Sequence, residues 1–229
     1  MKRIVIPELL DSDSGTPAEI AASLADLRAI NRRFGGITTT CGMIERAVAA
    51  SGKKHLALLD VGAADGESLA ECSRRLAERG IAVDYTLLDR VANHLHGGSL
   101  AAPALVGDAL ALPFAAGSFD LVACSLFAHH LEEEEIVTFV RRALEIARIA
   151  VLINDIRRSA FHLAFVRLAL PSFASRLTKH DAPVSIRRAY TTSEMAAMLQ
   201  RVGAARVDVT NHFFFRMAAI AWSKNTASN

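Results

Sequence analysis

The stretch LLDVGAADGESL, residues 58–69, decides the fold of this chain. It completes a short apolar strand pattern over Leu56–Val61, which Gly62 ends, and it begins a helical pattern over Gly66–Arg79. Small residues in the turn between them let the backbone approach a ligand closely, and the start of a helix offers free N–H groups. The stretch therefore predicts a strand, a ligand-binding turn and a helix.

Strand and helix patterns alternate on the C-terminal side of this stretch. Further strands are predicted at Val83–Leu88, Ala104–Gly107, Phe119–Ser125 and Ile149–Asn154, and helices at Glu132–Ala147, Ser159–Leu177 (interrupted by Pro171) and Thr192–Arg201. Val207–Val209 and Phe213–Trp222 predict a last hairpin with its turn at Asn211-His212. This alternation is typical of an α/β fold with a doubly wound, mostly parallel sheet.

The N-terminal region is expected to be helical over residues 16–50, with a break at Gly35-Gly36. Thr16 and Glu19 form a capping box, and Pro17 suits the first turn. We divide the chain, as one domain, into an N-terminal helical lid (1–54), a core (55–155), a helical insert (156–190) and a last helix with hairpin (191–229).

Composition excludes several classes of protein. The chain has 229 residues, 52% of them hydrophobic, and a net charge of +2, without the strongly basic character of nucleic-acid binders. Three scattered cysteines are typical of a reducing compartment. We find neither a signal peptide nor an apolar run of membrane-spanning length, and therefore expect a cytoplasmic protein.

Positive charge is concentrated in residues 141–190, which hold ten Lys or Arg against three acidic residues. Such an excess attracts an anionic substrate or an acidic lipid surface, so a transient contact with a membrane surface stays open. The other interpretation is a solvated helix face.

Glycine spacing and strand-end carboxylates indicate the ligand. Gly62 and Gly66 do not match the spacing of a dinucleotide fingerprint, and Gly66 is followed by Glu67 rather than the Lys of a phosphate-binding loop. A nucleoside that carries positive charge instead of phosphates fits better. S-adenosylmethionine is such a ligand: its ammonium and sulfonium groups suit Asp60 and Asp65.

Two further acids end the next strands. Asp89 can accept hydrogen bonds from ribose hydroxyls, and Asp108 can accept one from an adenine amino group. Each acid alone is often only a turn residue. Together they predict a nucleoside site at one edge of the sheet.

The sequence resembles class I S-adenosylmethionine-dependent methyltransferases. Leu59–Gly66 is similar to the first motif of that family, with Ala64 in place of its middle glycine, Asp89 to its second-strand acid, and 107–122 to its third and fourth motifs. Small-molecule enzymes of the ubiquinone, menaquinone and polyketide type look most similar. The resemblance implies a Rossmann-like sheet of seven strands with an antiparallel C-terminal strand.

From the resemblance and the strand-end pattern we predict a set of cofactor contacts. They are Asp60, Gly62, Ala63, Asp65, Gly66, Asp89, Arg90, Asp108, Ala109 and Ser125. Substrate contacts are predicted at Arg32, Arg157, Arg188 and Tyr190. The apolar residues of the insert indicate a small hydrophobic acceptor of phenolic, aromatic or quinone-like type.

Catalysis requires the acceptor to lose a proton, and a phenol benefits from a nearby base. His129 and His130 follow the fourth strand, and Asp155 ends the fifth, so these three are the predicted catalytic residues, with His130 favoured. Asn154-Asp155 has the reverse order of the acid–amide pair that holds magnesium in some catechol methyltransferases, so we predict no metal. One residue of a His pair often only packs or holds backbone.

Two other functions are weighed against methyl transfer. One is a non-catalytic regulatory or partner protein that binds S-adenosylmethionine, and the other is an NAD-dependent oxidoreductase, which the glycine spacing disfavours. The acceptor atom (oxygen, carbon or nitrogen) and the oligomeric state stay open.

Overall fold

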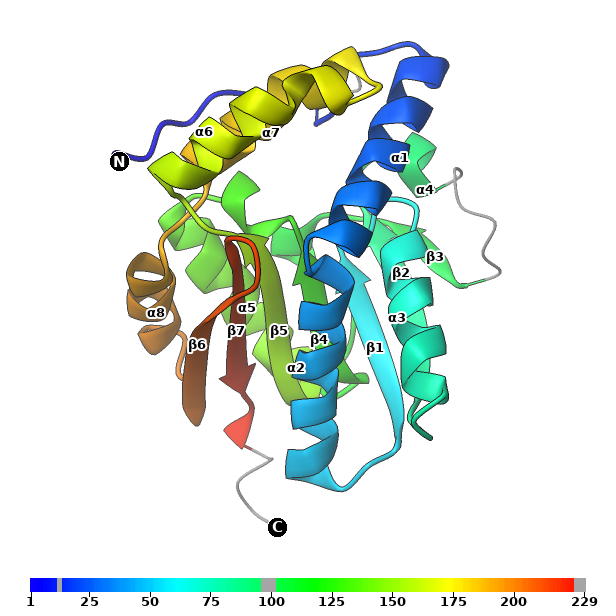
Figure 1. The fold of residues 1–229 in the computed structure, drawn as a ribbon. Coiled ribbons are helices and arrows are strands. Elements are labelled where there is room, and N and C mark those ends of the chain that lie inside the picture. Colours follow the sequence, from blue (N-terminus) through cyan, green and yellow to red (C-terminus); the bar gives the residue numbers. More distant parts are fainter. Residues whose placement is uncertain (12–13, 96–101, 225–229) are drawn as a thin grey trace.

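A seven-stranded sheet in the order β3-β2-β1-β4-β5-β7-β6 forms the centre of the computed structural model, which describes residues 1–11, 14–95 and 102–224 (Figure 1). The strands are β1 (His55–Val61), β2 (Ala82–Asp89), β3 (Ala104–Val106), β4 (Phe119–Ser125), β5 (Ala147–Ile156), β6 (Arg206–His212) and β7 (Arg216–Trp222). Only β7 runs antiparallel to its neighbours. The predicted Rossmann-like sheet is confirmed.

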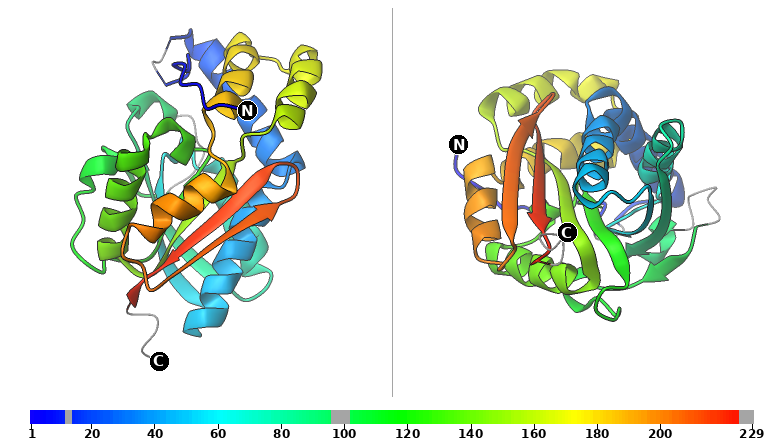
Figure 2. Two further views of the ribbon diagram at one scale, coloured as in Figure 1. Left: turned by 90° about the vertical axis from the view of Figure 1, so that its left-hand side faces the viewer. Right: turned by 90° about the horizontal axis from the view of Figure 1, so that it is seen from below.

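Helices cover both faces of the sheet and its carboxyl edge (Figures 1 and 2). They are α1 (Pro17–Arg33), α2 (Gly36–Ser51), α3 (Glu67–Ala77), the short α4 (Ala92–Leu95), α5 (Glu133–Ile146), α6 (Ala160–Ala169), α7 (Arg176–Arg188) and α8 (Thr192–Gln200). Pleat alternation divides the core: Leu152 packs under α2 and α3, whereas its neighbours Val151 and Ile153 pack under α5 and α8. Both faces of the central strands are therefore apolar.

The N-terminal helices begin and end where the sequence indicates. Thr16 and Glu19 form the capping box of α1. Gly35 separates α1 from α2 with a φ of 77°, a conformation that glycine adopts without strain. The kink lets α2 pack on the sheet while α1 rises above the sheet edge (Figure 1).

A roof of α1, α6 and α7 lies over the carboxyl ends of the strands, with the N-terminal segment against it (Figure 1). The Ile4 N–H donates to the Arg187 carbonyl, and the Asp181 carboxylate on α7 accepts from the N–H groups of Leu9 and Leu10. These bonds hold residues far apart in sequence in one layer and fix where the N-terminal side chains point.

Two local predictions are wrong. The insert contains a second helix, α7, beyond the expected end at Leu177, and the last hairpin turns at 213–215 instead of Asn211-His212. Phe214 takes a positive φ of 53° in this turn and stacks on Phe34 at 4.4 Å between ring centroids. Aromatic packing against the roof thus outweighs the turn preference of Asn and His.

Some of the positive charges of residues 141–190 are paired with carboxylates. Partners from other parts of the chain pair with several of them, among them Glu194 with Arg158, Glu19 with Arg176 and Asp11 with Arg188. Within the described residues, the local charge excess of this region is therefore partly neutralised.

The turn after β1 depends on a glycine. The N–H groups of Gly62 and Ala63 both donate to the Leu88 carbonyl at the end of β2, at 2.8 and 3.2 Å. Gly62 has a φ of 69°, and a Cβ there would lie 2.4 Å from the Phe127 ring and 3.1 Å from its Cβ. The ring and its Cβ cannot both move aside without disturbing the segment after β4.

We expect Gly62→Ala to destabilise the protein more than Gly80→Ala. Gly80 has a similar φ of 74°, but a Cβ there meets nothing within 4 Å. Both variants carry the left-handed strain of about 1–2 kcal/mol, and only Gly62→Ala adds overpacking of about 1–3 kcal/mol. Urea unfolding measures the difference, and equal losses in the two variants would show that the Phe127 contact is unimportant.

Candidate active site

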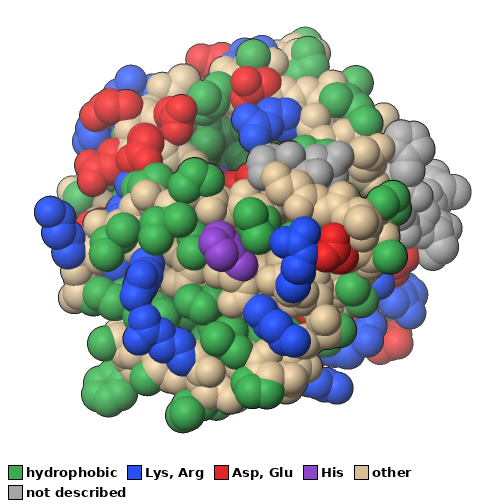
Figure 3. Space-filling view, turned by 90° about the horizontal axis from the view of Figure 1, so that it is seen from above, with side chains coloured by type: hydrophobic (Ala, Val, Ile, Leu, Met, Phe, Trp, Pro, Cys, Tyr) green, Lys and Arg blue, Asp and Glu red, His purple; other side chains and the backbone are tan. Residues whose placement is uncertain are grey.

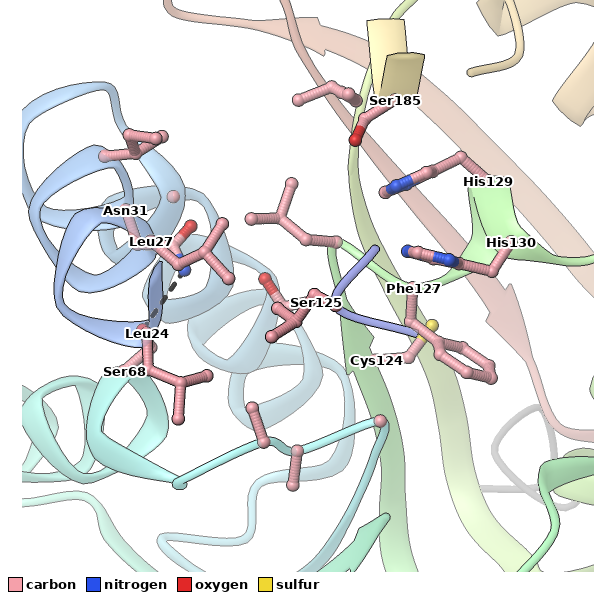
Figure 4. Close-up of a pocket in the computed structure, with 18 of the residues that line it drawn as sticks. Leu24, Leu27, Asn31, Ser68, Cys124, Ser125, Phe127, His129, His130 and Ser185 are labelled. Atoms are coloured by element: carbon pink, nitrogen blue, oxygen red, sulfur yellow. Dashed lines mark hydrogen bonds between the residues drawn. The ribbon is translucent and has the colours of Figure 1, made fainter. Parts of the chain in front are cut away.

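A cavity of about 680 Å³ lies above the carboxyl ends of β1, β2 and β4, beneath α1, α6 and α7. It opens at the switch point of the sheet, where β2 and β4 flank β1, the position at which open α/β sheets bind ligands. The loops after β1 and β4 form its floor and one wall, and the roof helices supply apolar side chains (Figure 4).

Most of the predicted cofactor contacts line this cavity. The lining includes Asp60, Gly62, Ala63, Asp65, Asp89, Arg90, Asp108, Ala109 and Ser125. Gly66 is absent from it and lies against Leu87 instead. The structure therefore brings nine of the ten predicted residues to one site, at the ends of four consecutive strands.

Asp60 at the end of β1 is buried without a compensating charge. No hydrogen bond or ion pair to its carboxylate is found among the described residues. Burial, together with the negative charge of Asp89, raises its pKa to about 7. A cationic ligand in the cavity would remove this penalty, so the site is built to receive positive charge.

Asp89 and Asp108 both organise backbone at the cavity. Asp89 accepts from the N–H groups of Ala64 and Val91, each at 2.9 Å, and Asp108 accepts from Leu110 N–H at 2.9 Å. A carboxylate oxygen accepts more than one hydrogen bond, so ligand hydroxyl or amino groups can still bind. Ala64 has a φ of 50°, left-handed backbone at the position where the family motif has glycine.

Asp65 already has a cation. Its carboxylate pairs with Arg28 of α1 and also accepts from the Glu67 N–H. This ion pair joins the roof to the loop after β1, so the predicted role of Asp65 toward a ligand ammonium competes with Arg28.

His129 is held between two carboxylates. Its Nδ1 lies 2.7 Å from Asp155 and its Nε2 lies 3.5 Å from Glu8, and Asp155 also accepts from the His129 N–H. Burial alone lowers the pKa of His129, but Asp155 and Glu8 outweigh it and raise the pKa to about 10. The imidazole therefore keeps its proton near neutral pH, which argues against the neutral base expected from sequence.

His130 lies beside it and faces the same cavity (Figure 4). Its Nδ1 is 2.7 Å from Asp11, and the Arg188 guanidinium donates to its backbone carbonyl. The N-terminal segment brings Glu8 and Asp11 to the histidines across more than a hundred residues of sequence. Asp155 itself lies behind His129 and is not part of the lining.

The four predicted substrate contacts do not all lie at the cavity. Arg188 lines the cavity, whereas Arg32, Arg157 and Tyr190 do not. Arg32 pairs with Glu71 on the surface, Arg157 lies over the Phe215 ring, and the buried Tyr190 donates its hydroxyl proton to the Leu131 carbonyl. The structure therefore does not bring these three residues to the candidate site, because nearer partners hold each of them.

Sequence reasoning missed several polar residues of the site. Arg216, at the start of β7, is 1% exposed and donates through Nη2 to Asn31, while its Nη1 has no partner among the described residues. Burial lowers the pKa of Arg216 to about 10. A lone Arg that opens an otherwise apolar strand was the available signal, and Glu8 and Asp11 gave none because their contacts are long-range.

No helix in the described part of the chain has both the length and the apolar character needed to cross a lipid bilayer.

Comparison with protein families gives a match for the central part of the chain. A family model described as "Methyltransferase domain" matches residues 58–149, from β1 into β5. No curated protein sequence matches the chain.

Solved structures share the fold at low sequence identity. The plantazolicin methyltransferase BpumL, in complex with a pentazolic desmethylPZN analog and SAH, matches with a TM-score of 0.65 at 15% identity over 90% of this chain and 96% of that one. A SAM dependent methyltransferase from Aquifex aeolicus matches at 0.59, with 14% identity over 91% and 98%. Magnesium protoporphyrin IX methyltransferase from Synechocystis PCC 6803, with bound SAH, matches at 0.53, with 18% identity over 83% and 84%.

We expect Asp60 to make stability fall as pH rises. Its pKa of about 7 in the folded state exceeds the ordinary value, so between about pH 4 and 7 the folded state holds a proton that the unfolded state has released. The free energy of unfolding then decreases with pH by up to about 1.4 kcal/mol per unit from this group. Asp60→Asn removes that slope.

Urea unfolding of both proteins from pH 4.5 to 8 checks this. The stability of the wild type relative to Asp60→Asn should decrease steadily across the range and level off above pH 7. Parallel stability curves would contradict the burial of an unpaired Asp60 carboxyl.

Proposed function

We propose that this chain, an S-adenosylmethionine-dependent methyltransferase whose residues 58–149 form the methyltransferase domain, methylates a small hydrophobic acceptor of phenolic, aromatic or quinone-like type. The target atom is oxygen or carbon.

The observation that carries cofactor binding is the Asp60–Asp89 pair at the ends of β1 and β2. Two cavity-facing carboxylates without a cation on Asp60 match a nucleoside that bears a sulfonium and an ammonium. Asp89 and Asp108 suit the ribose and adenine, and Ser125 lies where the methionine portion would extend. Methyl transfer is an in-line displacement, so such positioning supplies much of the rate.

The acceptor half of the cavity supports the hydrophobic part of the proposal. Its apolar lining comes from the roof helices, the segments next to them and the hairpin turn at 213–215: Leu24, Leu27, Phe34, Phe165, Val166, Phe173 and Phe214. Phe214 also packs edge-on against Phe165, at 4.7 Å between ring centroids. A flat aromatic acceptor can pack against such rings. Two structural neighbours are named as methyltransferases of plantazolicin and of magnesium protoporphyrin IX, and the former is in complex with a pentazolic desmethylPZN analog.

Acidic oxygens on the acceptor have suitable partners. Arg216 and Arg188 line the cavity, and the buried Arg216 guanidinium has no carboxylate within salt-bridge distance among the described residues. A buried cation that has only the charge of Asp155 nearby, without a direct ion pair, favours an anionic or strongly polar ligand group. This favours a phenol or hydroxyquinone over a hydrocarbon.

The catalytic edge is formed by His129, His130 and Glu8, where the acceptor hydroxyl would lose its proton. Asp11 and Asp155 each fix one imidazole through Nδ1, so both Nε2 atoms face inward. In this arrangement Asp155 is a positioning residue for His129, and it does not touch the acceptor.

The outer surface of α6 suits a lipid-like acceptor. Phe161 and Leu168 are 82% and 84% exposed and lie on one side of the helix, and Arg167 next to Leu168 is also exposed. Figure 3 shows hydrophobic side chains interspersed with Lys and Arg on the face seen from above. We propose that this surface touches membranes transiently.

Co-sedimentation with anionic vesicles tests the membrane contact. We expect the wild type to sediment with the vesicles and the double variant Phe161→Ser/Leu168→Ser to stay in solution. Absence of vesicle binding by the wild type would contradict the proposal.

A turnover assay tests the proposed function directly. Protein, S-adenosylmethionine and a panel of phenols and hydroquinones should give S-adenosylhomocysteine and an acceptor heavier by one CH₂ in equal amounts, by mass spectrometry. Turnover confined to polar acceptors such as amino acids would contradict the proposed acceptor class.

We expect His130→Asn to lower kcat by at least about 100-fold, because the acceptor is deprotonated at this edge. Affinity for S-adenosylhomocysteine should stay at the wild-type value, since His130 lies on the acceptor side. His212→Asn is the matched control: it removes an exposed imidazole on β6, outside the cavity lining. Wild-type kcat in His130→Asn would overturn the assignment.

A further inference from the structure

Three potential metal ligands converge at the catalytic edge. One ligand atom each from Glu8, His129 and His130 lies within 4.8 Å of the others. Glu8 Oε1 is 3.5 Å from His129 Nε2, and its Oε2 is 4.0 Å from His130 Nε2. Around a tetrahedral ion with bonds of about 2.0–2.1 Å, neighbouring ligands lie about 3.4 Å apart. Shifts of less than about one ångström therefore close the triad around an ion.

Both imidazoles are oriented as metal-binding histidines are. Nδ1 of His129 is 2.7 Å from Asp155, and Nδ1 of His130 is 2.7 Å from Asp11. A carboxylate on one ring nitrogen fixes the ring so that the other nitrogen faces the metal position. At His129 the ion would displace the proton that Nε2 shares with Glu8 in the metal-free protein. The two rings lie side by side, with centroids 4.2 Å apart, and both point into the cavity (Figure 4).

The charges around this triad favour a cation. Glu8, Asp11 and Asp155 are three carboxylates in or directly behind it, and the cations beside them are Arg188, with Nη1 3.5 Å from Asp11, and Arg216, which interacts with Asp155 through its charge. Glu8 and His129 are 7% and 2% exposed, so water screens these charges weakly. The remaining coordination positions face the cavity, which is the open geometry of catalytic metal sites.

We propose that Glu8, His129 and His130 bind a divalent first-row transition-metal ion at the acceptor end of the cavity. Two imidazoles and one carboxylate suit zinc, iron, cobalt or nickel, whereas magnesium prefers a set of oxygen ligands. The pair Asn154-Asp155, considered above for magnesium, is not this site: the Asn154 amide donates to the Gly36 carbonyl and to Thr40 on the side of α2.

The role of the ion rests on the proposed function. An acceptor hydroxyl that binds the ion releases its proton to solvent, because the metal stabilises the oxyanion. An oxygen lone pair then forms the bond to the methyl carbon as the carbon–sulfur bond breaks and its electron pair returns to sulfur. The products are a methyl ether and S-adenosylhomocysteine, and the ion keeps its charge and oxidation state.

Metal binding can be tested without any acceptor. Tag-free protein is stripped with EDTA, desalted, and titrated with Zn²⁺ against a chromophoric chelator, and then with Co²⁺ while visible absorption is recorded. We expect one tight Zn²⁺ per chain and a Co²⁺ spectrum with imidazole ligation that excess Mg²⁺ does not displace.

Variants locate the site. Glu8→Gln and His130→Asn should each weaken Zn²⁺ binding by at least about 100-fold, and the positioning variant Asp11→Asn by about 10–100-fold. The matched control is His94→Gln, which removes another buried imidazole that lines the cavity at the Asp89 side and should bind Zn²⁺ as the wild type does. Thermal unfolding of each variant confirms that it is folded.

Zn²⁺ binding that is absent in the wild type, or that survives both Glu8→Gln and His130→Asn, would overturn the metal site. S-adenosylhomocysteine binding, measured on the same samples, separates the two claims. Retained S-adenosylhomocysteine binding without Zn²⁺ binding would mean a metal-free methyltransferase, in which His130 acts directly on the acceptor proton.

Discussion

The site depends on one constraint: both faces of the central strands are buried under helices, so charged side chains can occur only where the strands end. Asp60, Asp89 and Asp155 are the last or nearly last residues of β1, β2 and β5, and Arg216 opens β7 beside them. Because parallel strands end at the same edge, these charges collect there: Asp60, Asp89 and Arg216 line the cavity, and Asp155 lies directly behind His129. The apolar interior of the sheet therefore confines charged side chains to its edge, and there they form the polar site.

The two halves of this edge differ in how their charged side chains are paired. On the cofactor side the Asp60 carboxylate has no hydrogen-bond or ion-pair partner among the described residues, and Ala64 has left-handed backbone, so both weigh against stability in the free protein. On the acceptor side each imidazole has a carboxylate on Nδ1. The cofactor side thus has an unpaired carboxylate that a cationic ligand can neutralise. On the acceptor side the two imidazoles are already held in fixed orientations. The N-terminal segment and Arg28 of α1 tie the roof to both.

Sequence patterns predict the structural features that depend only on residues close together in the chain. Apolar runs of strand length, the capping box at Thr16 and the small-residue turn at Gly62 are local features, and the structure confirms the sheet and helices that they predict. The cofactor loops follow from the strand ends for the same reason.

Features that depend on contacts between residues far apart in the sequence could not be predicted from local patterns. Glu8 reaches the histidines only because Asp181 and Arg187 hold the N-terminal segment against α7. Arg32 pairs with Glu71 on the surface, and the turn at 213–215 follows from packing on Phe34. The charge state of His129 likewise depends on Glu8, which no local pattern connects with it.

Calorimetric titration with S-adenosylmethionine and S-adenosylhomocysteine tests the central claim most directly. It should be done on the wild type, on Asp89→Ala, and on Asp84→Ala, which removes an exposed carboxylate from the same strand. We expect saturable binding of both nucleosides to the wild type and to Asp84→Ala, and loss of binding in Asp89→Ala. Folded wild-type protein that binds neither nucleoside would contradict the account, and so would equal binding by Asp89→Ala.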